Sequence, residues 1–122
     1  MPVQVQFRLR FMLDDSIALG PGKVALIESI ASTGSISAAA REHNMSYRRA
    51  WLLIEQVNAC FDEALVATAT GGKGGGGTTL TALGQEIVRL YREAEAAAQV
   101  AAKKPLAAIS RRLRHKVALT DS

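Results

Sequence analysis

Apolar and polar side chains alternate along the first segment of the chain. Between residues 3 and 13, one parity carries only apolar side chains: Val3, Val5, Phe7, Leu9, Phe11 and Leu13. This period of two predicts a half-buried β-strand over residues 3–13. Residues 14–16 read Asp-Asp-Ser, which is typical of a turn, and residues 17–19 can return as the second arm of a hairpin.

After this hairpin, the spacing of the apolar residues changes to that of a helix. Residues 20–22 read Gly-Pro-Gly and open a first helix, whose apolar stripe is Val24, Ile27, Ile30 and Ala31. Gly34 is suited to end this helix, because glycine adopts a left-handed backbone conformation without strain. Ser35 is a good N-cap for a short second helix over about residues 36–43, which is rich in small side chains.

A third helix follows a break at residues 44–45. Ser46 can cap this helix, and we expect it to run to about Phe61. Its predicted buried stripe consists of Ala50, Leu53, Ile54, Val57 and Phe61. We also expect Trp51, on the flank of the stripe, to lie in the core.

The next segment consists of two strand-like stretches separated by a glycine-rich stretch. Residues 65–70 resemble a strand, residues 71–77 hold six glycines, and residues 78–80 resemble a return strand. Together they predict a β-hairpin with a long glycine tip. Thr81 can cap a fourth helix with apolar residues at helical spacing, and Pro105 is expected to interrupt that helix.

Three helices followed by a β-hairpin is the element order of a winged helix-turn-helix. The predicted fold is therefore mainly α with a small β component, with an N-terminal strand or hairpin and a long C-terminal helix. We divide the chain into a winged helix-turn-helix domain with a dimerising helix, residues 1–102, and a basic tail, residues 103–122. An alanine stripe on the fourth helix and the strand that lacks a sheet partner both predict a homodimer.

Charge and composition narrow the class of protein. The chain has 122 residues, which is the size of one domain, and its net charge of +4 lies in the tail, because residues 1–102 carry a net charge of −1. The single cysteine, Cys60, excludes a disulfide framework and is expected to be a small buried side chain. No nucleophile with a base is evident. We expect a cytoplasmic protein without a signal peptide, membrane contact or catalytic activity.

The start of the third helix carries the candidate DNA-binding chemistry. In a helix-turn-helix, the first residues of this helix reach base edges in the major groove, and the fork of an arginine can bind guanine O6 and N7 together. Arg48 and Arg49 fit that role, although they could instead form a solvated helix face with ion pairs to Glu55 or Glu42. Ser35, Ser37 and the amides at the two helix starts could bind phosphates. We expect Tyr47 to be partly exposed, with its hydroxyl on a phosphate.

Two motifs in order carry a family resemblance. The segments 34–51 and 69–84, which read GSISAAAREHNMSYRRAW and ATGGKGGGGTTLTALG, are similar to the N-terminal DNA-binding domain of the ModE-type molybdate-responsive transcription regulators. A more distant resemblance is to the DNA-binding domain of LysR-type regulators. The resemblance covers about residues 5–100.

This resemblance implies a dimer that binds double-stranded DNA in a sequence-specific way. It maps the phosphate- and base-contacting residues onto Ser35, Ser37, Ser46, Tyr47, Arg48, Arg49 and Lys73. Full-length members of the family also carry C-terminal modules that bind oxyanions, and this sequence ends before them. We therefore expect no cofactor and no response to molybdate or tungstate within this chain, and a separate oxyanion-binding protein could supply the response.

Several alternatives stay open. The domain could be an interaction module that pairs with another regulator or protein and binds DNA weakly or not at all. The glycine loop could bind an oxyanion through its amides, and Lys73 in that loop could reach a phosphate or only solubilise the loop. The basic tail could strengthen DNA binding, lie on an anionic membrane, or form a solvated end.

Overall fold

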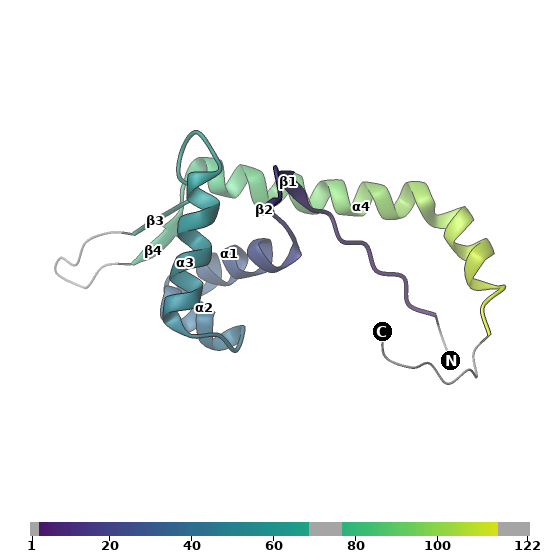
Figure 1. Ribbon diagram of the computed structural model, residues 1–122, viewed down its shortest axis with the longest axis horizontal. Helices are drawn as coiled ribbons and strands as arrows, with labels where there is room; N and C mark the ends of the chain where they lie inside the picture. The colour runs from purple at the N-terminus through teal and green to yellow at the C-terminus, as the bar shows by residue number, and fades with distance from the viewer. Residues whose placement is uncertain (1–2, 69–76, 115–122) are drawn as a thin grey trace.

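A computed structural model describes residues 3–68 and 77–114 of the chain (Figure 1). Two short β-hairpins and four helices follow one another in the predicted order. They are β1 (Phe11–Leu13), β2 (Ser16–Leu19), α1 (Pro21–Thr33), α2 (Ile36–Glu42), α3 (Tyr47–Ala59), β3 (Val66–Thr68), β4 (Thr78–Leu80) and α4 (Ala82–Ser110). The winged helix-turn-helix prediction is confirmed: three helices are followed by the β3–β4 hairpin and then by one long helix.

The predicted caps set the ends of the helices. The side chains of Ser35, Ser46 and Thr81 each accept a hydrogen bond from the backbone N–H three residues later, at 3.0, 3.1 and 3.0 Å. These bonds satisfy donors that have no partner inside the helix. Gly34 ends α1 in the left-handed conformation, with a φ of 73°, and its N–H donates to the Ile30 carbonyl. Each of these helix boundaries is therefore set by local sequence.

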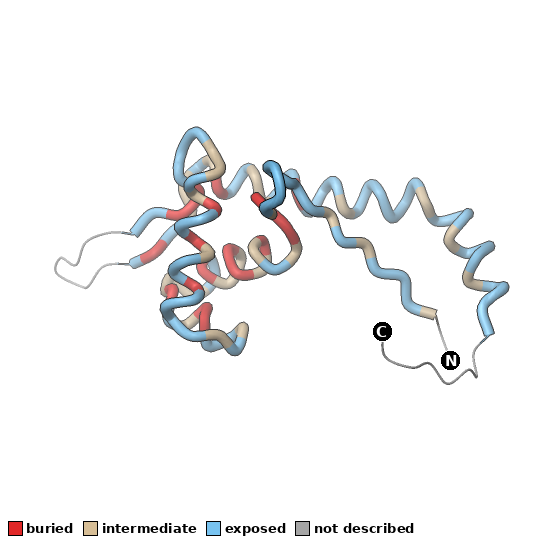
Figure 2. The backbone as a smooth tube through the Cα atoms, in the orientation of Figure 1, coloured by how far each residue is buried: buried red, intermediate tan, exposed pale blue. Residues whose placement is uncertain are grey.

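The core lies among α1, α2, α3 and the first turns of α4 (Figure 2). Its largest fully buried side chains are Leu26, Ile27, Ile30, Leu65, Val24 and Val57. The predicted stripe on α1 is partly wrong, because Ala31 is exposed and Leu26 is buried. The helix is covered on more than one side, since α2, α3, α4 and β4 all contact it. A single stripe therefore underestimates its buried surface.

The N-terminal strand is much shorter than predicted. Only residues 11–13 pair, antiparallel with β2, and residues 3–10 continue without strand pairing. Alternating side chains favour a strand, but a strand also needs a neighbour to accept its backbone hydrogen bonds. A hydrogen bond holds part of this segment instead, because the Tyr91 hydroxyl donates to the Leu9 carbonyl at 2.7 Å.

Asn58 fixes the base of the wing, the β3–β4 hairpin. Its side-chain oxygen accepts from the N–H groups of Leu65 and Val66, at 2.9 and 3.2 Å, and its amide nitrogen donates to the Val66 carbonyl at 3.0 Å. The Thr78 N–H donates to the Gly34 carbonyl at 3.0 Å. The wing is thereby tied to both α3 and the end of α1. Most of the glycine tip, with Lys73, lies outside the described residues.

The first half of α4 packs on the core, and its second half extends away from it (Figure 1). Arg92 joins α4 to α1 through a two-pronged contact with the Glu28 carboxylate, at 2.9 and 2.6 Å, and this hydrogen bonding lowers the pKa of Glu28. The prediction that Pro105 interrupts the helix is wrong, because α4 continues to Ser110. Pro105 removes one N–H donor, yet alanine-rich neighbours favour helix and the open carbonyl can bind water.

The helix also crosses residue 102, where we divided the chain, and that division stays a prediction. Across the residues that the structure describes, no helix combines the length and apolar character that a membrane crossing needs.

Candidate nucleic-acid interface

The turn between α2 and α3 holds the start of α3 at the surface. Asn44 takes the left-handed conformation, with a φ of 54°, and the Met45 N–H donates back to the Ala40 carbonyl at 3.0 Å. Asparagine tolerates this conformation better than most residues. Ala50, Ile54 and Val57 then bury the inner face of α3. The first turn of α3 is therefore held between a closed turn and the core.

The outer side of this first turn is exposed and cationic. Ser46, Arg48 and Arg49 are exposed, and Tyr47 is 54% exposed, as predicted. None of the ion pairs among the described residues includes Arg48 or Arg49. The alternative in which these arginines pair with Glu42 or Glu55 is therefore not observed. Both guanidinium groups are available to an external anion or base edge.

A polar cleft of about 270 Å³ lies between the helix-turn-helix and the wing. Its lining includes Ser35, Ser37 and Tyr47 from the helical side and Thr68 and Thr78 from the wing. The Ser35 hydroxyl already accepts the Ala38 N–H. Helix geometry leaves the first amides of α2 without acceptors inside the helix. The structure thus brings the predicted site residues Ser35, Ser37 and Tyr47 together in one polar cleft. The other three described site residues, Ser46, Arg48 and Arg49, lie on the adjacent face of α3.

Two predictions about α3 need correction. Trp51, expected in the core, is 43% exposed, and Leu52 beside it is also exposed. The residue lies on the flank of the helix where no other described element covers it. Cys60, expected to be buried, is only half-buried and has a free thiol.

A second concave region on the α3 side lies between the N-terminal segment, the start of α1 and α3. It has a volume of about 440 Å³, and Arg8, Arg10, Lys23, His43 and Arg49 contribute to its lining. Sequence reasoning did not find this region. Arg8 and Arg10 lie on the polar parity of the alternating segment 3–13, and nothing in that period places them next to α3.

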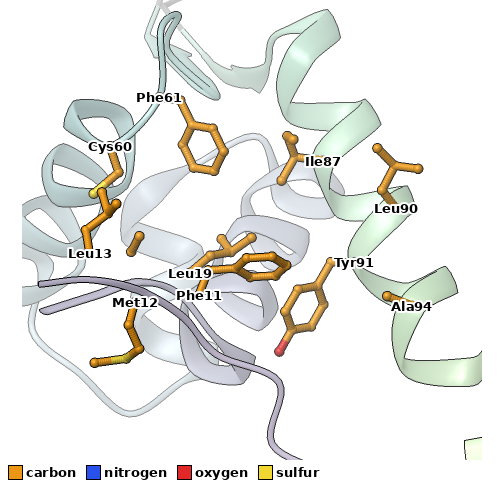
Figure 3. A pocket seen from close by; sticks show the side chains of 11 residues that line it. Phe11, Met12, Leu13, Leu19, Cys60, Phe61, Ile87, Leu90, Tyr91 and Ala94 are labelled. Carbon is orange, nitrogen blue, oxygen red and sulfur yellow. The ribbon is translucent and has the colours of Figure 1, made fainter. Parts of the chain in front are cut away.

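An apolar groove of about 540 Å³ lies on another face of the molecule (Figure 3). The β1–β2 hairpin, the residues directly after α3 and the first half of α4 line it. Phe11, Met12 and Leu13 are each about half exposed in this groove, although they are large apolar side chains. Tyr91 closes one side, with its ring tilted against that of Phe11 at a centroid distance of 6.4 Å.

Within residues 3–68 and 77–114, we find no candidate metal site, because no three histidine, cysteine, aspartate or glutamate side chains are grouped so that they could hold a metal ion. The fold and the cationic helix start define a winged helix-turn-helix in which the first turn of α3 is exposed.

Residues 22–85 match the bacterial regulatory helix-turn-helix proteins of the lysR family, and the chain belongs to this family. It is 39% identical over 89 residues to the "DNA-binding transcriptional dual regulator ModE" of Escherichia coli K12, an alignment that covers 73% of this chain and 34% of the relative. The predicted resemblance to ModE-type regulators is therefore confirmed.

Two further relatives are also similar to this chain. A "Molybdenum transport protein ModE" from Herbaspirillum seropedicae is 48% identical over 69 residues, covering 57% of this chain and 26% of the relative. A "Molybdenum-pterin-binding protein MopB" from Rhodobacter capsulatus is 44% identical over 78 residues, covering 64% and 29%. The chain spans about a third of the length of the curated relatives it matches, or less.

Proposed function

We propose that this protein is a sequence-specific, DNA-binding transcription regulator that places the start of α3 in the major groove of duplex DNA. The observation that carries the proposal is the pair Arg48 and Arg49, which is exposed, free of ion pairs among the described residues, and held at a capped helix start. Arginines in this position of a helix-turn-helix read base edges. The protein acts by binding, without catalysis, in the cytoplasm.

The neighbouring residues position the duplex. Ser35, Ser37, Ser46 and Tyr47 bind backbone phosphates, with the polar cleft between α2 and the wing receiving one strand. Phosphate contacts fix the register of a protein on DNA, and base contacts give the sequence preference. Lys73, in the glycine-rich segment between β3 and β4, would add a phosphate contact. That residue lies outside the described part of the chain, so its role rests on the family resemblance.

The regulated genes belong to molybdenum metabolism. The names of the relatives support this part of the proposal, because they refer to ModE regulation, molybdenum transport and molybdenum-pterin binding. The chain matches about a third of those relatives or less, so their sensing of an oxyanion is not transferred to it. A separate oxyanion-binding protein would supply a response to molybdate or tungstate, and this chain would bind no cofactor.

The DNA-binding form is a homodimer whose second copy covers the apolar groove and the second half of α4. Both surfaces are apolar, exposed and continuous: Leu90 and Ala94 line the groove, and Ala97 and Ala101 continue their stripe along α4. Small side chains permit close approach of two helices. A two-fold axis through this contact would place the two α3 helices on half-sites about 34 Å apart, or a multiple of that distance.

Fluorescence anisotropy tests the proposal. A duplex is first selected from a random library by the purified protein, and binding is then compared for the wild type, Arg48→Ala and Arg49→Ala. Each substitution should weaken binding to the selected duplex by about 1–3 kcal/mol and reduce discrimination against single base changes. Arg89→Ala is the matched control, because Arg89 is an exposed arginine on α4. Equal affinity of all four proteins for the selected duplex would contradict the proposal.

The second candidate function is an interaction module that pairs with another protein. The apolar groove favours it, because this surface would accept an apolar partner helix as well as a second copy. Under this alternative the protein forms a stable heteromer and does not shift promoter DNA. A steep dependence of DNA binding on salt concentration would favour the regulator instead.

A further inference from the structure

The cationic region between the N-terminal segment, α1 and α3 has the features of an anion-binding pocket. Four side chains with permanent positive charge line it: Arg8, Arg10, Lys23 and Arg49. No carboxylate is among its lining residues, and none of these four takes part in an ion pair within the described chain. Like charges this close repel one another, so a bound anion would lower the electrostatic energy of the pocket.

The two N-terminal arginines are held in place by their neighbours. The Leu9 carbonyl accepts the Tyr91 hydroxyl, and the Leu9 side chain packs on the small core around Leu19, Val24 and Tyr91. Side chains alternate in an extended segment, so Arg8 and Arg10 lie on the side opposite Leu9. A Cβ placed on Gly20 would be only 3.4 Å from Cγ of Arg10, so the stem of this arginine lies against the start of α1.

The start of α1 supplies the other wall. Its N-cap is Gly20, which has no side chain to accept the first amides, and its first turn contains no acidic residue. The Lys23 ammonium donates to the Ile17 carbonyl, which holds this charge beside the pocket. Ile17, Pro21, Met45 and Leu53 add apolar surface. The ligand that fits this combination is a phosphate with an attached apolar body such as a deoxyribose.

The position of the pocket points to DNA as the source of that phosphate. Tyr47 lines the cleft on the wing side of α3, whereas Arg49 lines this pocket. The two residues lie 200° apart on an ideal helix at 100° per residue. A duplex held by the first turn of α3 would therefore pass the wing cleft on one side and the cationic pocket on the other.

We propose that Arg8, Arg10 and Lys23 bind a phosphodiester of the DNA backbone in this pocket, on the side of α3 opposite the wing, while Arg49, which also lines the pocket, keeps its proposed base contact. The N-terminal segment thus extends the DNA contact beyond the helix-turn-helix. This inference rests on the proposed function and deepens it, because it assigns a phosphate site to residues outside the helix-turn-helix and the wing.

The first test compares the double variant Arg8→Gln/Arg10→Gln with Arg89→Gln and the wild type. Binding of the double variant should be about 5- to 20-fold weaker on the selected duplex and on unrelated duplexes alike. The decrease of log K with log salt concentration should become less steep by about 1. Arg89→Gln should change neither quantity. All three arginines are exposed, so the melting temperatures should agree.

The second test locates the phosphate. Single methylphosphonate linkages, which carry no charge, are placed one at a time along the selected duplex. The wild type should lose affinity at a backbone position outside the bases that Arg48 and Arg49 read, and the double variant should lose none there. A loss of affinity that occurs in the wild type and not in the double variant is expected if the two arginines contact that phosphate directly.

Three results would overturn the inference, and they can be told apart. If the wild type binds DNA and the double variant has the same affinity and salt slope, the pocket does not bind backbone phosphate, although the proposed function stands. If the wild type binds no duplex, the proposed function fails and takes this inference with it. If inorganic phosphate binds at micromolar concentration without DNA, and Arg8 and Arg10 are required, the pocket belongs to a free anion.

Discussion

The helical core and the long helix α4 place their apolar side chains in opposite ways. In α1–α3, the apolar positions meet one another inside the chain, and Val24, Leu26, Ile27 and Ile30 are fully buried. Beyond Tyr91, α4 buries no residue, and Val100 and Ile109 are 76% and 60% exposed (Figure 2). The first region is complete within one chain. The second carries an apolar pattern that no other described segment of the chain covers.

This contrast predicts that the stability of the fold and the association of two copies depend on different residues. Substitutions in the helical core and at its contacts with the wing should change the free energy of unfolding. Substitutions on the exposed face of α4 should change association and leave the fold intact.

Gly84→Ala should have the largest effect on stability. A Cβ at this position would lie 2.1 Å from the Leu65 carbonyl oxygen, so α4 and the residue that precedes β3 would have to move apart. We expect a loss of about 2–4 kcal/mol in the free energy of unfolding, measured by urea denaturation. Gly22→Ala is the matched control, because a Cβ at Gly22 meets nothing within 4 Å. This control should change stability by about 0.5 kcal/mol or less, and an equal loss in both variants would contradict the account.

Ala97→Glu should weaken dimerisation without unfolding the chain. Ala97 is exposed and lies on the same stripe as Leu90 and Ala94, so a second copy would bury the new carboxylate. Sedimentation equilibrium should show a dimer dissociation constant at least about 10-fold higher, because a buried unpaired charge costs more than 1.4 kcal/mol. Gln99→Glu adds the same charge on the opposite face and should leave the dimer unchanged. A monomeric wild type at micromolar concentration would remove the basis of this prediction.

Asn58→Ala should loosen the wing. The substitution removes three hydrogen bonds and leaves the amide of the buried Val66 without its partner. We expect a loss of about 1–3 kcal/mol in stability, together with weaker DNA binding because the wing loses its fixed position. Asn58→Asp keeps the accepting oxygen and should recover part of the stability. Hydrogen exchange at Leu65 and Val66 would check the cause, and unchanged protection in Asn58→Ala would contradict it.

The Glu28–Arg92 contact should give a small dependence of stability on pH. The hydrogen bond from Arg92 lowers the pKa of Glu28, so its stabilising effect is complete above the ordinary carboxyl pKa and is lost as the pH falls through the lower folded value. Both side chains are about 40% exposed, which limits the effect to about 1 kcal/mol or less. Glu28→Gln should remove this part of the difference in stability between pH 7 and pH 3, and Glu86→Gln should not.

Local sequence signals predicted the helix boundaries well. Ser35, Ser46 and Thr81 cap helices because each side chain needs only an amide three residues away, and Gly34 ends α1 through its own backbone conformation. The alternation over residues 3–13 was misleading, because it records which side chains are apolar and not whether a neighbouring strand is present. Trp51 was placed in the core for the same reason: the period of a helix does not say what covers its flank.

The candidate site was predictable only where one segment contains it. The first turn of α3 has its cap, turn and arginines within a few residues, so sequence reasoning found them. Asn58, which bonds to Val66, and the pocket that joins Arg8 to Arg49 depend on contacts between distant segments. No period in the sequence encodes such contacts, and only the fold reveals them.

A titration of the ¹⁵N-labelled protein with the selected duplex, followed by NMR, tests most directly whether α3 reads DNA. We expect the amides of Tyr47, Arg48 and Arg49 to shift most, together with those lining the wing cleft, while the amides of Leu90 and Ala94 in the apolar groove stay in place. Shifts concentrated in the groove, with the start of α3 unchanged, would contradict the assignment of α3 as the DNA-reading helix.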